Sequence, residues 1–217
     1  MLLRAARTQP SAILLFAQLG AILVYPFLEG SDVGRALFSV IGVLILGLVL
    51  LAVRGSPAHT WVGILLGVPA TILLLIQAVT RSADLLPWSS AFEAVLYFYA
   101  AGALIAYMLE DHVITRDELW AVGATFTLVA WGFAYTYIVC QALAPGSFTA
   151  AVDPEADRTW MEFLFLSFTT LSSTGLSDVI PIKPFARSLS MIEQLAGLLY
   201  VAMVVSRLVA LTVRRPA

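Results

Sequence analysis

The chain has 217 residues, of which 60% are hydrophobic and 12% are charged, and its formal net charge is −2. A soluble domain carries about 25% charged residues, so this composition excludes an ordinary soluble domain and favours an integral membrane protein. The near-neutral charge gives no indication of nucleic-acid binding. One cysteine, Cys140, and two distant histidines, His59 and His112, leave no disulfide and no metal-ligand cluster, so we expect no enzyme and no cofactor.

Six apolar segments are long enough to cross a bilayer, which requires roughly 20 residues. In chain order they are Ser11–Leu28, Ala36–Val53, Trp61–Thr80, Trp88–Leu109, Leu119–Leu143 and Ser188–Val213. Short turns join the first four segments, so we expect consecutive helices to be neighbours. No small-residue cleavage site follows the first segment, which predicts a retained membrane helix rather than a signal peptide.

The distribution of basic residues predicts the orientation in the membrane. Six crossings place both termini on one side, and with the termini inside, seven basic residues lie inside and five outside. The positive-inside rule therefore predicts cytoplasmic termini in the plasma (inner) membrane. The inner set is Arg4, Arg7, Arg54, Arg116, Arg207, Arg214 and Arg215, and the outer set is Arg35, Arg81, Arg158, Lys183 and Arg187.

The connection before the fifth segment indicates a boundary between two domains. Thr115 and Glu118 have the spacing of a capping box, which predicts a helix that begins there. The segments before it have no arginine at every third position and so do not resemble a voltage sensor. We expect a four-helix membrane domain over residues 1–114 and a separate functional unit over residues 115–217.

A short apolar segment and a polar stretch lie between the last two spans. The sequence TWMEFLFLSFTTL has 13 residues, too few to cross, and predicts a re-entrant helix. The following LSSTGLSDVIPIKP contains Gly175, which allows a left-handed backbone, among small hydroxyl residues. Non-helical backbone at membrane depth must be buried in protein or line water. Backbone and hydroxyl oxygens beside the C-terminal end of a helix favour a cation, so this stretch predicts a cation filter.

The same stretch resembles the pore module of potassium channels, which consists of an outer helix, a pore helix, a filter and an inner helix. The family's filter reads Thr-Val-Gly-Tyr-Gly-Asp before a proline, and here Ser173-Thr174-Gly175-Leu176-Ser177-Asp178 precedes Pro181. The last segment, RSLSMIEQLAGLLYVAMVVSRLV, is similar to the inner helix of bacterial six-span, "two-transmembrane-type" ion-channel proteins. The resemblance implies an all-α homotetramer that passes monovalent cations, with K⁺ as the first candidate and Na⁺ as the second. It also implies that Ser173, Thr174 and Gly175 are the ion-binding residues.

Two residues depart from the family's filter. Leu176 replaces the tyrosine whose hydroxyl ties the filter to the pore helix in the family, and Ser177 replaces the second glycine. A left-handed backbone at Ser177 would cost about 1–2 kcal/mol per subunit. We therefore expect the inner ion sites to persist and the outer ones to change. The alternatives are a pore of altered selectivity, a K⁺ pathway with fewer sites (as in the single-glycine loops of Trk/Ktr-type uptake proteins), a non-conducting scaffold or partner subunit, and a transporter component.

Four further residues are candidates for roles around the filter. A charged group in a membrane helix is a functional hypothesis, and Glu193 is expected either to brace the pore helix or the filter or to act as an ion ligand. Gly197 is either the gating hinge that the resemblance implies or a site of close helix packing. Arg207 either snorkels to the lipid interface or belongs to a cytoplasmic gate, and Asp178 adds negative potential at the outer mouth. The expected partners are other copies of the chain and membrane lipid, with no soluble partner.

Overall fold

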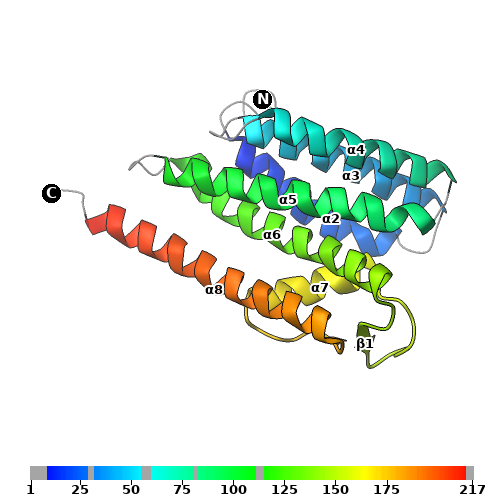
Figure 1. The fold of residues 1–217 in the computed structure, drawn as a ribbon. Helices are drawn as coiled ribbons and strands as arrows, with labels where there is room; N and C mark the ends of the chain where they lie inside the picture. Colours follow the sequence, from blue (N-terminus) through cyan, green and yellow to red (C-terminus); the bar gives the residue numbers. More distant parts are fainter. Residues whose placement is uncertain (1–8, 29–31, 55–59, 81–82, 111–114, 214–217) are drawn as a thin grey trace. The chain divides into compact units, whose positions relative to one another are not determined.

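The computed structural model of the protein describes residues 9–28, 32–54, 60–80, 83–110 and 115–213 (Figure 1). It separates into two compact units, Met1–Leu128 and Val129–Ala217, and the boundary falls inside one long helix. The domain boundary expected before Thr115 therefore stays a prediction. Several residues on which the sequence predictions rest lie outside the described set: Arg4, Arg7, His59, Arg81, His112, Arg214 and Arg215.

The first unit is a bundle of apolar helices (Figure 1). Its elements are α2 (Pro10–Leu28), α3 (Asp32–Arg54), α4 (Thr60–Thr80), the short 3₁₀ turn η1 (Ala83–Leu85), α5 (Leu86–Leu109) and the first half of α6 (Arg116–Leu143). Helix α3 contacts α2, α4 and α5, and α4 contacts α5. The expectation that consecutive helices are neighbours is confirmed for these helices.

Hydrogen bonds at the start of α6 confirm the predicted capping box. The Glu118 amide donates to Thr115 Oγ1 at 3.2 Å, and the Thr115 amide donates to Glu118 Oε1 at 3.3 Å. Asp117 accepts from the Ser11 amide at 3.1 Å and from Ser11 Oγ at 2.8 Å. Because the first amides of a helix lack partners and carry partial positive charge, the Asp117 carboxylate stabilises the start of α2.

The lengths of the described helices give four candidate membrane crossings. They are Pro10–Leu28, Leu86–Leu109, Arg116–Leu143 and Pro184–Arg207. The apolar stretches Val40–Ala52, Trp61–Gln77 and Trp160–Leu171 are shorter. The protein is therefore an integral membrane protein by the length and composition of its helices, and six crossings stay a prediction.

The second unit holds the elements around the polar stretch. These are the second half of α6, strand β1 (Phe148–Ala150), α7 (Trp160–Leu171), strand β2 (Val179–Pro181) and α8 (Pro184–Val213). The short helix predicted from the sequence is observed as α7, which packs against α8. A capping box begins it, with the Thr159 amide donating to Glu162 Oε2 at 2.6 Å and the Glu162 amide to Thr159 Oγ1 at 3.3 Å.

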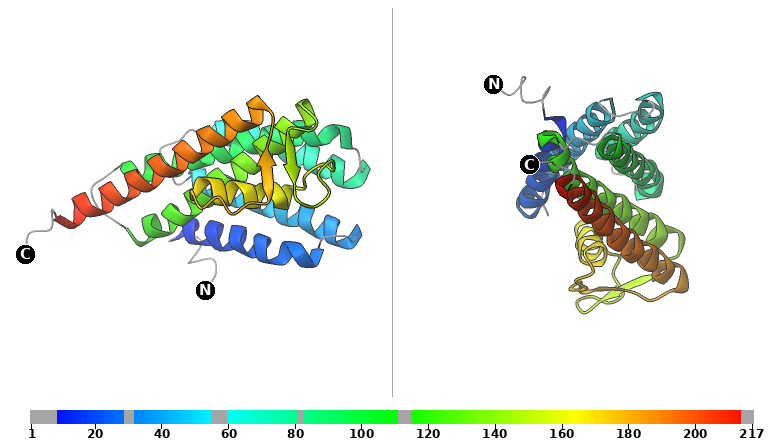
Figure 2. Two further views of the ribbon diagram at one scale, coloured as in Figure 1. Left: turned by 90° about the horizontal axis from the view of Figure 1, so that it is seen from below. Right: turned by 90° about the vertical axis from the view of Figure 1, so that its left-hand side faces the viewer.

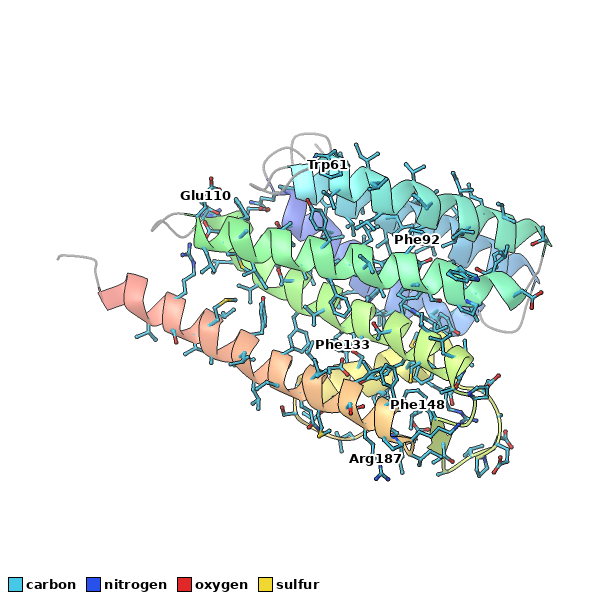
Figure 3. The ribbon with its side chains drawn as sticks, viewed as in Figure 1. Trp61, Phe92, Glu110, Phe133, Phe148 and Arg187 are labelled. Carbon is cyan, nitrogen blue, oxygen red and sulfur yellow. The ribbon has the colours of Figure 1, made fainter. Side chains whose placement is uncertain are left out.

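Two short strands, which the all-α prediction did not include, lie beside the polar stretch. Strands β1 and β2 pair in antiparallel fashion, with Thr149 opposite Ile180, and lie side by side in Figure 2. Phe148 of β1 packs on Phe163 of α7 with ring centroids 4.7 Å apart, and both rings contact Tyr137. Figure 3 labels Phe148 of this cluster. The cluster joins α6, β1 and α7 into one core.

Candidate functional site

The loop after α7 folds back onto the last turn of that helix. The Ser172 amide donates to Phe168 O at 3.1 Å and the Ser173 amide to Thr170 O at 3.0 Å. The amides of Thr174 and Gly175 both donate to Thr169 O, at 2.9 and 3.1 Å. Ser173 and Gly175 have φ angles of 60° and 66°, the left-handed geometry that such helix ends require.

The three predicted ion-binding residues lie together in this loop. Ser173, Thr174 and Gly175 are exposed in the single chain, and their amides point to the end of α7. Among the hydrogen bonds within the described parts of the chain, none ends on a carbonyl oxygen of these three residues. Their oxygens therefore keep their capacity to bind a cation, which a filter needs.

The side chain of Thr174 ties the loop to α7. Its hydroxyl donates to Thr169 O at 3.3 Å and lies 3.0 Å from Ser172 Oγ. Ser172 Oγ also donates to Phe168 O at 2.6 Å. Leu176 lacks the hydroxyl of the family's tyrosine and is 76% exposed. The hydroxyls of Ser172 and Thr174 hold the loop to the helix instead.

The backbone geometry at Ser177 differs from the expectation for a second glycine. Asp153 and Ser173 are the non-glycine residues with positive φ in the described parts of the chain, so Ser177 does not need a left-handed backbone. Instead, Ser177 Oγ accepts from the Val179 amide at 3.0 Å. Asp178 is exposed, and β2 begins at the next residue. The loop is therefore anchored by α7 at one end and by the β1–β2 pair at the other.

Glu193 connects the three helices of this unit. It is 0% exposed, and its Oε2 accepts a hydrogen bond from Tyr137 Oη of α6. Its Oε1 is hydrogen-bonded with Ser167 Oγ of α7, while Ser190 Oγ lies 3.2 Å from Tyr137 Oη. The carboxyl group predicted to contact the pore helix thus lies beside a hydroxyl of that helix.

The two other candidates on α8 lie in different surroundings. Gly197 is buried, and an added side chain would overlap the carbonyl group of Leu171, the last residue of α7. This contact favours close helix packing as the reason for the glycine. Arg207 is half-buried ten residues further along α8. The gating roles of both residues stay predictions.

The loop between α6 and α7 is organised by a buried arginine. Arg158 is 6% exposed and donates to Ala156 O, Val152 O and Asp153 O. It also forms an ion pair of 3.1 Å with Glu162 in the first turn of α7. The loop's acidic side chains are exposed: Asp153, Glu155 and Asp157. Arg158 therefore links the loop backbone to the start of α7.

Comparison with known proteins assigns this arrangement to a family. Residues 94–214, more than half of the chain, match the family described as "Ion channel". The chain belongs to this ion-channel family. The match includes α6, α7, the loop and α8, and it confirms the resemblance at the level of a potassium-channel-like pore family. Because the family consists of ion channels, the prediction that the chain is not an enzyme is confirmed.

Two curated relatives have the same printed name, "Protein LctB". The protein from Geobacillus stearothermophilus is 33% identical over 119 residues, which cover 54% of this chain and 88% of the relative. The protein from Bacillus caldotenax is 32% identical over 101 residues, which cover 45% of this chain and 75% of the relative. No solved structure matches the chain significantly.

Sequence reasoning missed three side chains of the second unit. They are Tyr137, Ser167 and Ser190, to which the sequence analysis assigned no role. The hydroxyls of Tyr137 and Ser167 contact the Glu193 carboxyl group, and Ser190 Oγ contacts Tyr137 Oη. The available signal was a buried acid in a membrane helix, since such a group needs polar partners on neighbouring helices.

Proposed function

We propose that four copies of this chain form a membrane pore for monovalent cations, K⁺ and also Na⁺. In this proposal α2, α3, α4, α5, α6 and α8 cross the plasma membrane, α7 enters it from outside, and both termini are cytoplasmic. The carbonyl oxygens of Ser173, Thr174 and Gly175 line the pore. Permeant K⁺ is the ligand, and membrane lipid surrounds the assembly.

The observation that best supports this proposal is the division of polar groups in the loop after α7. The amides of Thr174 and Gly175 are held by Thr169 O, whereas the carbonyls of Ser173 to Gly175 accept no hydrogen bond from a described residue. The C-terminal end of α7 adds partial negative charge at the same place. A loop whose amides are already hydrogen-bonded and whose carbonyl oxygens are available suits a cation rather than an anion.

The exposure of α8 and of the loop supports assembly with other copies. Of the side chains described on α8, the buried ones form a narrow stripe of Ala186, Ser190, Glu193 and Gly197. Large apolar side chains such as Leu195 and Leu198, 57% and 59% exposed, occupy other faces. One chain supplies one loop, so enclosing a cation requires a closed ring of copies. We propose that the ring has four copies, as the family resemblance implies.

Altered selectivity is the form of conduction that the loop favours. Leu176 is exposed, and the hydroxyl oxygen of Ser177 accepts a hydrogen bond from the Val179 amide. The outer part of the loop therefore differs from a filter with tyrosine and a second glycine. We expect weaker discrimination between K⁺ and Na⁺ than in potassium channels with the complete motif.

Reversal potentials test the proposal directly. Purified protein in a planar bilayer is expected to give a current whose reversal potential under a K⁺/Na⁺ gradient shows a modest preference for K⁺. The double variant L176Y/S177G is expected to move the reversal potential toward that of K⁺. Leu143→Tyr is the matched control, because Leu143 has the same 76% exposure at the end of α6.

Two outcomes would contradict the proposal. Protein that passes no current at any voltage or membrane tension would favour the non-conducting scaffold or partner subunit. A double variant that behaves like the control would mean that residues 173–178 are not the filter.

A further inference from the structure

The carboxyl group of Glu193 lies in a closed hydrogen-bond network. Its Oε2 accepts from Tyr137 Oη, and its Oε1 contacts Ser167 Oγ. Ser167 Oγ is also 2.8 Å from the carbonyl oxygen of Ala130. Glu193 and Ser167 are both 0% exposed. The hydrogens needed for these contacts must therefore come from the groups themselves.

Counting the hydrogens around Ser167 indicates the protonation state of Glu193. The Ala130 carbonyl can only accept, and the Ser167 hydroxyl has one hydrogen to donate. When Ser167 donates to Ala130, its contact with Glu193 requires a hydrogen from the carboxyl group. An ionised Glu193 would leave one of the two contacts as a pair of oxygens with no hydrogen between them.

The other carboxyl oxygen is consistent with this arrangement. Tyr137 Oη donates its one hydrogen to Oε2, so Oε2 acts as the carbonyl oxygen of the acid. Ser190 Oγ lies 3.2 Å from both Tyr137 Oη and Ala186 O. Because Tyr137 gives its hydrogen to Oε2, the contact between Ser190 and Tyr137 uses the hydrogen of Ser190. One proton on Oε1 completes a continuous network from Ser190 to Ala130.

The surroundings of Glu193 offer no compensating charge. Among the described side chains, no arginine, lysine or histidine forms an ion pair with it. Tyr137 is the titratable group that faces it, with Cys140 one turn further along α6. On α7 the nearest acid, Glu162, is paired with Arg158. A buried carboxylate without a cationic partner is strongly unfavourable, whereas the neutral acid is not.

We propose that Glu193 is an uncharged, protonated acid that positions the pore helix by donating to Ser167 and accepting from Tyr137. The role rests on the proposed pore function, because Ser167 lies two residues before Thr169, whose carbonyl holds the amides of Thr174 and Gly175. If Glu193 loses its proton, Ser167 must donate its hydrogen to Glu193 instead of to the Ala130 carbonyl. The turn of α7 that contains Ser167 then loses its hydrogen bond to α6. Glu193 is a positioning residue in this scheme and does not touch the ion.

Infrared spectroscopy measures this proton. The spectrum of the purified full-length protein at neutral pH is expected to contain the carbonyl band of a protonated carboxylic acid that is lost in Glu193→Gln. Glu155→Gln is the matched control, since Glu155 is an exposed acid of the same unit and its replacement should remove no such band. A Glu193→Gln spectrum with the band intact would overturn the inference.

A second variant keeps the inference testable if Glu193→Gln does not fold. Tyr137→Phe removes the donor to Oε2 and is expected to move the same band to higher frequency, because the acid carbonyl then lacks a hydrogen bond. An unshifted band would contradict the assignment of the band to Glu193 and of Oε2 to its carbonyl.

Current measurements test whether Glu193 positions α7, in addition to carrying a proton. Glu193→Ala is expected to lose most of the current, and Glu193→Gln to recover part of it, since an amide presents N–H to Ser167 and C=O to Tyr137. Equal currents in the two variants would contradict the positioning role. The infrared result does not depend on conduction, so a protein with the band but without current would contradict the proposed function alone.

Discussion

Gly197 of α8 lies against the carbonyl group of Leu171, the last residue of α7, and a side chain at position 197 would overlap that carbonyl. The contact comes one helical turn after Glu193, which meets Ser167 of the same α7 helix. Helix α8 therefore holds the end of α7 at two levels. A displacement of α8 is expected to move the turn of α7 that precedes the loop of residues 172–178.

Replacing Gly197 by alanine is expected to destabilise the protein. The added methyl group must displace backbone atoms, and inserting a group into a packed core costs about 1–3 kcal/mol. The measurement is the thermal unfolding midpoint in detergent, which should fall. Gly102→Ala is the control, because nothing lies within 4 Å of the added methyl group there. A Gly197→Ala variant as stable as the control would contradict the contact with Leu171.

Ser167→Ala tests the hydrogen bond between α7 and Glu193 of α8. Removing the hydroxyl leaves Glu193 Oε1 without its partner in a site that water does not reach, which costs about 1–3 kcal/mol. Ser188→Ala removes a hydroxyl that donates to Pro184 O at 3.1 Å on the exposed side of α8. Its effect on stability should stay within about 0.5 kcal/mol. Equal unfolding midpoints for the two variants would show that Ser167 is not a buried partner of Glu193.

Thr174→Val tests the hydroxyl tie between the loop and α7. The variant keeps the backbone oxygens but loses the bond to Thr169 O, a loss of about 0.5–1.5 kcal/mol in holding the loop. We expect conduction with a lower K⁺/Na⁺ permeability ratio, measured from reversal potentials. Thr136→Val makes the same change where the hydroxyl donates to Gly132 O at 2.8 Å within α6. The tie is refuted if both variants keep the original ratio.

Two glycine substitutions at neighbouring serines should have opposite effects on stability. Ser173 has φ 60°, and relief of a left-handed backbone, about 1–2 kcal/mol, exceeds the entropy cost of glycine, about 0.5–1 kcal/mol, so Ser173→Gly is expected to stabilise the loop. Ser172 has φ −78° and donates to Phe168 O, so Ser172→Gly should destabilise it. Thermal unfolding of the two variants gives the comparison. A fall in the midpoint for both would argue against the left-handed geometry at Ser173.

Arg158→Lys is expected to loosen the external loop. A lysine has no guanidinium fork and cannot hold several carbonyls and Glu162 at once. Cleavage at Glu155 by a glutamate-specific protease should become several-fold faster. Arg187→Lys is the control, because Arg187 is exposed, points away from the helices in Figure 3 and donates to Pro181 O. Unchanged cleavage in Arg158→Lys would mean that the arginine does not order the loop.

Features that depend on local sequence could be predicted closely. The first span was expected from Ser11 and begins at Pro10, and the fifth was expected to end at Leu143, where α6 ends. Thr115 and Glu118 marked the start of α6 correctly. These predictions succeed because the length of an apolar run and the spacing of a capping pair belong to one segment of the chain.

Contacts between segments could not be predicted in the same way. Nothing local distinguishes Tyr137 from the other aromatic residues of α6, and strands of three residues have no pattern that pairs Thr149 with Ile180. The sequence indicated that a left-handed backbone at Ser177 would be costly, but it could not show that the turn onto Thr169 places the left-handed geometry at Ser173.

The sequence by itself determined that this chain is a membrane protein with a short polar loop between a half-length helix and a final span. Composition and segment length suffice for that, because the bilayer sets the length of every crossing. Only the tertiary structure decided which groups meet: Glu193 with Ser167 and Tyr137, and Gly197 with Leu171. The reason is that hydrogen bonds and close packing depend on how α6, α7 and α8 pack, and residues far apart in the chain become neighbours only in the folded protein.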